Sequence, residues 1–293
     1  MDQWGGGISP DGVGGLAPAG GLSHPVLPRE SVPHPLPMSE LSLETAGSGP
    51  DLVLLHGWGL SRRVWRVAPG LLGWLGARHR VTLVDLPGHG ASGGRLWPLD
   101  DVLAALAAAL PARAHWLGWS LGGMLGLAFA ARWPQRVRSL RLVAAVPRFA
   151  AAPDWPQGMA AGALTAMGER LAADRDGELR RFLALQFLDD PLPAAERRAL
   201  QRGVRDAAPS AAALADGLRL LRTLDLRPAY AGLACPAAVL LGGRDRLVDP
   251  ALAAALRTLN PAVPVRVLTG AGHAPFLTRP AAFRDWLREA ARD

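Results

Sequence analysis

The sequence contains no lysine, one cysteine and one tyrosine among its 293 residues. A single cysteine, Cys235, excludes an internal disulfide and a cysteine-based metal site, which favours a reducing, cytoplasmic location. The longest apolar run covers only the nine residues from Val102 to Leu110, whereas a membrane-spanning helix needs about 20. The first seven residues lack the basic and apolar regions of a secretory signal. We therefore predict neither a membrane span nor a secreted protein.

Arginine supplies all 32 basic residues, against 25 acidic ones, for a net charge of +7. Because these arginines are spread along the chain and not gathered in a tail or stripe, a nucleic-acid partner is not expected. One stretch differs, since no acidic residue lies between Asp101 and Asp154. That stretch contains Arg113, Arg132, Arg136, Arg138, Arg141 and Arg148.

The N-terminal residues 1–37 are rich in glycine and proline and have no hydrophobic periodicity. We predict a disordered tail there, because such a segment cannot bury enough apolar surface to fold. The residues from Met38 to Thr45 resemble an edge strand. This change of character raises two alternatives for the start of translation, Met1 and Met38.

Beyond Leu52, short apolar runs alternate with helical patterns such as Leu99, Leu103, Leu106 and Leu110. This alternation predicts an α/β fold with a mostly parallel sheet and helices on both of its faces. The predicted buried strands are 52–55, 81–85, 114–119, 137–146, 237–241 and 263–268.

Residues 150–233 interrupt this rhythm, because they show helical patterns and no convincing strand. Glu178–Leu188 and Ala212–Leu224 have the spacing of amphipathic helices. We predict a helical cap over the carboxyl edge of the sheet, where ligands bind in such folds. The sheet domain would then comprise residues 38–149 and 234–293.

The pattern Gly-x-Ser-x-Gly occurs at residues 90–94 and again at 118–122. A nucleophile elbow needs a strand that runs directly into the serine and a helix that leaves it. Ser120 has both neighbours, whereas Ser92 lies in a glycine loop. We predict that Ser120 is a nucleophile and that Ser92 is structural. The alternative is that Ser120 is only a small residue in a tight turn.

A serine hydroxyl needs a base to become a nucleophile, and imidazole is the usual one. His273 follows the last predicted strand within the glycine-containing loop 270–276 and is our candidate. The alternative is an ordinary surface-loop histidine. The remaining histidines are His24 and His34 in the tail, His79 and His115 at strand entrances, and His56 and His89 in loops after strands.

The imidazole in turn needs a carboxylate that fixes its tautomer. Asp245 comes after the strand 237–241, and it precedes His273 by 28 residues. The alternative for Asp245 is a turn or helix-capping role. The chain order Ser120, Asp245, His273 is that of the α/β-hydrolase fold.

An ester carbonyl that is attacked also needs backbone N–H donors for its developing oxyanion. The residue after the nucleophile, Leu121, supplies one such donor, and Trp58, in the loop after the first parallel strand, is placed to supply the other. The alternative for Trp58 is that it only packs against the cap.

Together these segments resemble the α/β-hydrolase superfamily. More narrowly, the chain from about Met38 onward is similar to the family of pimeloyl-acyl-carrier-protein methyl ester carboxylesterases of biotin synthesis. The resemblance is carried by residues 54–60, 64–66, 85–90, 116–123, 243–248 and 272–276, and by the cap segments 181–186 and 221–227.

The resemblance implies hydrolysis of the methyl ester of a pimeloyl group on acyl carrier protein, with release of methanol and no metal or organic cofactor. Family substrate contacts correspond to Trp58, Ser120, Leu121, the stretch from Phe149 onward, and His273. The stretch 148–156 departs from the family by replacing polar residues with alanine. A monomer is expected.

The resemblance also implies an acidic carrier protein that meets arginines near the entrance to the cap. Arg136, Arg138, Arg141 and Arg148 are candidates for that surface. The alternative is that several of them only occupy a helix end and a strand.

Three other functions share parts of this pattern. A small-ester esterase or a carbon–carbon bond hydrolase would use the same three catalytic residues with a different cap pocket. Haloalkane dehalogenases and epoxide hydrolases are disfavoured, because they need a carboxylate in place of Ser120. A non-catalytic binding relative usually lacks a member of the triad, and none is missing here.

Overall fold

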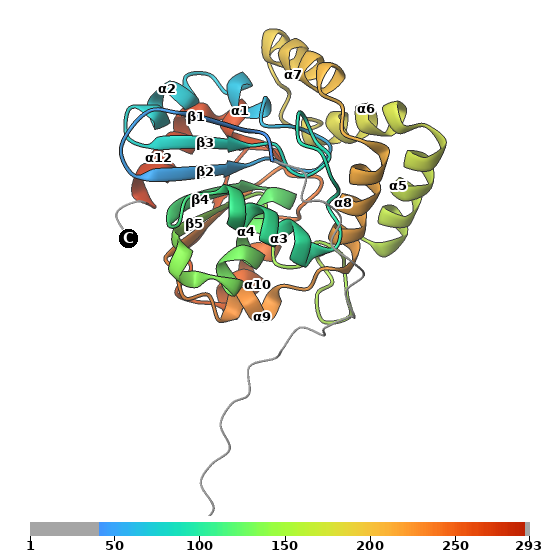
Figure 1. Ribbon diagram of the computed structural model, residues 1–293. Helices are drawn as coiled ribbons and strands as arrows, with labels where there is room; N and C mark the ends of the chain where they lie inside the picture. The colour runs from blue at the N-terminus through green and yellow to red at the C-terminus, as the bar shows by residue number, and fades with distance from the viewer. Residues whose placement is uncertain (1–40, 291–293) are drawn as a thin grey trace, which may run out of the picture. The chain divides into compact units, whose positions relative to one another are not determined.

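The computed structural model describes residues 41–290 (Figure 1). The predicted tail 1–37 and the alternative start at Met38 lie outside the described residues. No described helix is both long enough and apolar enough to cross a membrane.

A seven-stranded sheet forms the centre of the described chain, in the order β1-β3-β2-β4-β5-β6-β7. Neighbouring strands are parallel except β1, which pairs antiparallel with β3 at the edge. The predicted mostly parallel sheet and the edge strand after Met38 are confirmed. The strands are β1 (Leu43–Ala46), β2 (Asp51–Leu55), β3 (Arg80–Val84), β4 (Ala114–Trp119), β5 (Val137–Val143), β6 (Ala237–Gly242) and β7 (Val265–Leu268).

Helices cover both faces of this sheet, as predicted. Val53 and Leu55 of β2 pack in one buried cluster and Leu52 and Leu54 in the other, because successive side chains of a strand point to opposite faces. The first cluster includes α3 (Leu99–Ala109), α4 (Leu121–Arg132) and α10 (Leu252–Leu259). The second includes α1 (Val64–Val67), α2 (Leu71–Gly76), α11 (Pro275–Thr278) and α12 (Pro280–Glu289). A short 3₁₀ helix, η1 (Pro134–Arg136), precedes β5.

Between β5 and β6 the described chain forms helices and two isolated bridges, and no strand. The predicted cap helices correspond to α6 (Arg175–Gln186) and α8 (Ala211–Thr223). The sequence pattern did not identify α5 (Ala161–Ala173), α7 (Ala194–Asp206) and α9 (Arg227–Ala231). Figure 1 shows α5 to α8 gathered at one end of the sheet.

Candidate active site

Ser120 occupies a sharp turn between β4 and α4. Its backbone has φ 54° and ψ −123°, a conformation that non-glycine residues rarely adopt and that is often found at functional sites. Hydrogen bonds fix the turn, because the Ser120 N–H donates to the Val143 carbonyl at 2.9 Å and the Gly123 N–H donates to the Ser120 carbonyl at 2.9 Å. Ser120 therefore has the strand, turn and helix that a nucleophile elbow requires.

The glycines around Ser120 allow the backbone to pack this closely. A Cβ on Gly118 would lie 2.5 Å from the Gly123 Cα, and one on Gly123 would lie 2.4 Å from the Ala145 Cβ. A Cβ on Gly122 would lie 2.5 Å from the His56 carbonyl oxygen. The glycines of the motif are thus required by space at this turn.

Gly122→Ala is expected to destabilise the protein by about 2–4 kcal/mol, since the new methyl group meets rigid backbone at the end of β2. Urea denaturation would measure the change. Gly73→Ala is the matched control, because no atom lies within 4 Å of its added Cβ, and alanine favours a helix by up to ~1 kcal/mol over glycine. Equal stability of the two variants would contradict the tight turn.

The loops after β6 and β7 bring Asp245 and His273 together. The His273 Nδ1 lies 2.7 Å from the Asp245 Oδ2, and both side chains are buried. Because an ionised carboxylate only accepts hydrogen bonds, Nδ1 carries the proton and Nε2 keeps its lone pair. The N–H groups of Leu247 and Val248 donate to the Asp245 Oδ1 at 2.8 and 3.1 Å, which holds the carboxylate in place.

His273 is also joined to the residue before the predicted nucleophile. The Trp119 indole Nε1 donates to the His273 carbonyl at 2.8 Å, and the two rings lie 5.6 Å apart. Ser120 is only 6% exposed and His273 only 1% exposed. The His273 Nε2 is buried and has no hydrogen-bond partner among the described residues. The Nε2 is thus buried near the turn that carries Ser120, and no hydrogen bond joins it to the Ser120 hydroxyl among the described residues.

Trp58 lies beside Ser120 and under the cap. A Cβ on Gly57 would lie 3.2 Å from the Ser120 Cβ, and one on Gly217 of α8 would lie 2.6 Å from Trp58 Cδ1 and 3.3 Å from Leu121 Cδ2. Leu121 begins α4, so its N–H has no acceptor one turn earlier in the helix. The Trp58 N–H likewise takes no part in the backbone hydrogen bonds of the described residues. Neither N–H group therefore has a backbone acceptor among the described residues, as a pair of oxyanion donors requires.

Trp58 also packs against the cap, as its alternative interpretation held. Its indole Nε1 donates to the Leu214 carbonyl of α8 at 2.9 Å. Its ring meets the Phe182 ring of α6 edge to face, with centroids 4.7 Å apart. The two roles are compatible, because the oxyanion would use the backbone and the cap uses the ring.

The other histidine and serine candidates of this region have structural roles. The Leu86 N–H donates to the His56 Nε2 at 3.0 Å, and burial lowers the pKa of His56 to about 3. Burial likewise lowers the pKa of His89 to about 4. The Ser92 Oγ donates to the Asp85 carbonyl at 2.6 Å. These contacts agree with the assignment of Ser92 to a structural loop.

Phe149 is 5% exposed and belongs to the larger buried cluster, together with Trp58 and Leu121. Its carbonyl accepts a hydrogen bond from the Met159 N–H at 2.8 Å, which closes the loop that leads into the cap. A role for Phe149 in substrate binding stays a prediction.

The four arginines proposed for a carrier-protein surface are not brought together. Arg136 donates to the carbonyls of Ala107 and Leu110 at the end of α3, at 2.9 and 3.1 Å. Arg138 lies near the start of β5, which pairs with the start of β4. The strands rise about 3.3 Å per residue, so this edge is about 20 Å from Ser120. Arg136 and Arg138 thus occupy a helix end and a strand, which agrees with the alternative interpretation of these arginines.

The other two arginines are engaged within the protein. Arg141 is only 9% exposed, so its predicted place on a contact surface is wrong: it lies on β5 at the centre of the sheet. Arg148 is half-buried and donates to Asp225 at 2.6 Å, and this ion pair joins the loop after β5 to the loop between α8 and α9.

Sequence reasoning missed Gln186, the last residue of α6. Its side chain is buried, and neither its amide nitrogen nor its amide oxygen has a partner among the described residues. Its main-chain carbonyl accepts a hydrogen bond from the His273 N–H at 3.4 Å. No sequence signal separates such a buried glutamine from one on an exposed helix face.

No group of three or more histidine, cysteine, aspartate or glutamate residues within 41–290 is arranged to hold a metal ion. The polar groups of the site described above are a hydroxyl, an imidazole, a carboxylate and backbone amides. Those groups suit acyl transfer through a covalent serine intermediate.

Comparisons with known proteins agree with this chemistry. The model of the alpha/beta hydrolase family matches residues 52–286. The pimeloyl-[acyl-carrier protein] methyl ester esterase of Methylococcus capsulatus is 43% identical over 244 residues, which cover 81% of this chain and 93% of the relative. The esterase of the same name from Xanthomonas campestris is 45% identical, over 81% of this chain and 93% of its own length. That from Edwardsiella ictaluri is 43% identical, over 84% of this chain and 95% of its own length.

Solved structures give the same fold. An esterase from Exiguobacterium antarcticum superposes with a TM-score of 0.78 at 22% identity, covering 87% of this chain and 96% of its own. E-2-(acetamidomethylene)succinate hydrolase superposes with a TM-score of 0.69 at 27% identity, covering 88% and 97%.

Proposed function

This chain belongs to the alpha/beta hydrolase family, and from that premise we propose that it is a serine carboxylesterase that hydrolyses the methyl ester of pimeloyl-[acyl-carrier protein] and releases methanol. The observation that carries the chemistry is the buried His273–Asp245 pair beside the Ser120 elbow. The substrate is supported by relatives of that name at 43–45% identity. The match leaves only about a fifth of this chain uncovered. Because the cap, residues 150–233, is longer than that uncovered part, the similarity must extend into the cap.

In the proposed mechanism the His273 Nε2 takes the proton of the Ser120 hydroxyl as its oxygen attacks the ester carbonyl. The N–H groups of Trp58 and Leu121 stabilise the oxyanion, and Asp245 stabilises the imidazolium. Methanol leaves with the proton from His273. Water then hydrolyses the acyl-enzyme by the same steps, which restores the hydroxyl of Ser120.

Methanol release from the pimeloyl-carrier methyl ester tests this function. The purified protein is expected to release one methanol for each ester cleaved, and to restore growth without biotin in a strain that lacks its own esterase. Turnover of small free esters alone, without growth, would favour a general esterase. Failure to react with a fluorophosphonate would favour a non-catalytic relative.

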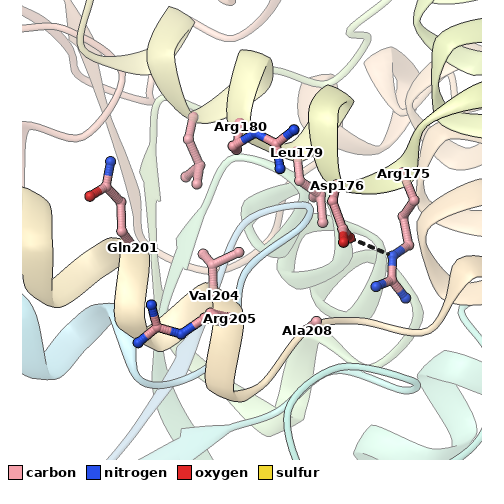
Figure 2. A pocket seen from close by; sticks show the side chains of 9 residues that line it. Arg175, Asp176, Leu179, Arg180, Gln201, Val204, Arg205 and Ala208 are labelled. Atoms are coloured by element: carbon pink, nitrogen blue, oxygen red, sulfur yellow. Dashed lines mark hydrogen bonds and ion pairs between the residues drawn. The ribbon is translucent and has the colours of Figure 1, made fainter.

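A groove between α6 and α7 is our candidate for the approach of the carrier-linked chain. It has a volume of about 380 Å³, and its lining includes Leu179, Arg180, Val204 and Arg205. Figure 2 shows the apolar side chains Leu179 and Val204 in the space between the two helices. On its other side Leu179 adjoins the site, since a Cβ on Gly59 would lie 2.9 Å from Leu179 Cδ2.

The rim of this groove is basic, which suits an acidic carrier protein. Arg180 is exposed, and its ion pair with Asp174 is long, at 4.0 Å. Arg197 is exposed at the adjoining pocket and makes no ion pair among the described side chains. We therefore propose that the arginines of α6 and α7 make the carrier contact, in place of Arg136, Arg138, Arg141 and Arg148.

Reversal of both charges in Arg180→Glu/Arg197→Glu is expected to lower kcat/KM for the carrier-linked ester by about 10- to 100-fold at low salt, because like charges then oppose association. The loss should shrink as salt screens the charges. Turnover of a small free ester should stay unchanged.

Arg113→Glu/Arg138→Glu is the matched control, because it also reverses two exposed arginines, which lie beside the starts of β4 and β5 at the end of the sheet opposite Ser120. An equal loss in this control would assign the effect to net charge and contradict the groove. A monomeric state and a cytoplasmic location remain parts of this proposal.

A further inference from the structure

The connection between α6 and α7 contacts two loops, one with the proposed triad carboxylate, Asp245, and the other with the proposed base, His273. Its residue Asp189 forms an ion pair with Arg246, and the Asp189 carbonyl accepts a hydrogen bond from Arg244 at 3.3 Å. Arg244 and Arg246 flank Asp245 in the sequence. The cap is therefore joined directly to the loop of the proposed triad carboxylate.

The next residue, Asp190, is joined to the loop of the proposed base. Its Oδ2 accepts a hydrogen bond from the Gly272 N–H at 2.9 Å, and Gly272 precedes His273. Its Oδ1 lies 2.7 Å from an Arg279 guanidinium nitrogen. That contact is an ion pair and not an aligned hydrogen bond, since Oδ1 has no aligned donor. The Gly272 N–H is thus the best-directed partner of this carboxylate.

Asp190 is only 1% exposed, although it is charged and lies in a connecting loop. A buried carboxylate is costly unless charges and hydrogen bonds compensate for its lost hydration. Arg279 supplies the charge, and it also donates to the Gly270 carbonyl at 2.9 Å, in the same loop as Gly272. Asp190 and Arg279 therefore hold the segment before His273 from two sides.

Close packing leaves this segment little freedom. A Cβ on Gly272 would lie 3.0 Å from the Gln186 carbonyl oxygen and 3.2 Å from the Asp190 Cβ. The next N–H along the chain, that of His273, donates to the same Gln186 carbonyl. The N–H groups of Gly272 and His273, two successive residues of the loop after β7 (the histidine loop), thus donate to acceptors in the cap. Displacement of Asp190 would release the main chain that carries the imidazole.

We propose that Asp190 is a positioning residue, which acts through the Gly272 N–H to hold His273 in its reactive place and so makes the reactivity of Ser120 depend on a docked cap. This inference rests on the proposed serine mechanism. It assigns a contribution to catalysis to a cap residue that touches neither Ser120 nor the imidazole in the contacts described above.

Asp190→Ala and Asp190→Asn test this role, with a small p-nitrophenyl ester as substrate. Asp190→Ala removes the acceptor, so kcat and the rate of fluorophosphonate labelling are expected to fall about tenfold or more, because small displacements of a catalytic group are costly. KM should change less than twofold. Asp190→Asn keeps an oxygen that accepts from the Gly272 N–H, and it is expected to recover most of the labelling rate.

Asp225→Ala is the matched control, because Asp225 also joins cap segments through arginine, at 2.6 Å from Arg148, without a contact to the histidine loop. It should lower thermal stability but leave the labelling rate unchanged. If Asp190→Ala does not fold, Asp190→Leu replaces it, since leucine keeps the volume without an acceptor.

Two results would overturn the proposal. One is a labelling rate of the acceptor-free variant equal to that of wild type, and the other is a loss no larger than that of Asp225→Ala. An unreactive wild-type protein would instead refute the serine mechanism, so the two failures are distinguishable.

Discussion

Ser120→Ala is expected to lower esterase turnover by about 10⁴- to 10⁶-fold, with KM and thermal stability near the wild-type values. The alanine keeps the elbow, since the hydrogen bonds of the turn are made by the main chain of Ser120. It removes the oxygen that attacks the ester carbonyl in the proposed mechanism. Initial rates with a small ester, together with fluorophosphonate labelling, would measure the effect.

Ser92→Ala is a matched control for that variant, because Ser92 stands in the other Gly-x-Ser-x-Gly pattern of the chain. Its hydroxyl is buried, accepts from the Ser42 N–H at 2.8 Å and donates to the Asp85 carbonyl at 2.6 Å. Its loss should cost about 1–3 kcal/mol of folding free energy, while labelling persists. Near-normal turnover by Ser120→Ala, or loss of labelling in Ser92→Ala, would contradict the assignment.

The sheet was predictable from the sequence because its central strands are buried on both faces. Such strands are short continuous apolar runs, as in β2, β4 and β6. The cap helices were harder to predict. α7 buries only Leu200, and α5 buries three side chains in an alanine-rich segment. Helices with so few buried apolar side chains offer few positions from which a helix can be predicted, and their stability depends on tertiary contacts.

The contact between Asp245 and His273 was predictable for a topological reason. In a parallel sheet the loops after the strands lie at one edge, so Asp245 after β6 and His273 after β7 share the edge at which Ser120 follows β4, whatever their separation along the chain. Strand order alone thus limits which polar residues can share a site. The catalytic role of the three residues stays a prediction.

The predicted arginine surface was wrong because closeness in sequence does not imply closeness in space. Residues that follow one another along β5 point alternately to the two faces of the sheet, and they run from one of its edges to the other. A stretch without acidic residues therefore need not form a basic patch in space. The basic rim of the cap instead combines α6 and α7, whose arginines are interspersed with acidic residues in the sequence.

The contacts of Asp190 and Gln186 could not be predicted from the sequence either. Gln186 ends α6 and Asp190 lies in the connection to α7, two settings in which glutamine and aspartate are normally exposed. Only the folding of this connection against the loop before His273 buries them. Their positions depend on tertiary packing, and no local pattern reports it.

Asp245→Asn is expected to lower turnover by about 10⁴-fold while the loop keeps its shape. The amide oxygen can still accept from the N–H groups of Leu247 and Val248, which bind the Asp245 Oδ1. The amide nitrogen would then face the His273 Nδ1, which lies 2.7 Å from Oδ2 in the native pair. An amide donor at that place favours an imidazole with its proton on Nε2, and Nε2 can then no longer accept the proton of Ser120.

The measurement is kcat with a small ester across the pH range, alongside circular dichroism to show that the fold is retained. Asp249→Asn is the matched control, because Asp249 is an exposed aspartate of the same loop whose Oδ1 accepts only from the Ala251 N–H, at 2.8 Å. That variant should retain turnover within about twofold, as surface changes usually do. A loss of only a few-fold in Asp245→Asn would mean that Asp245 merely shapes its turn, and that another group orients the imidazole of His273.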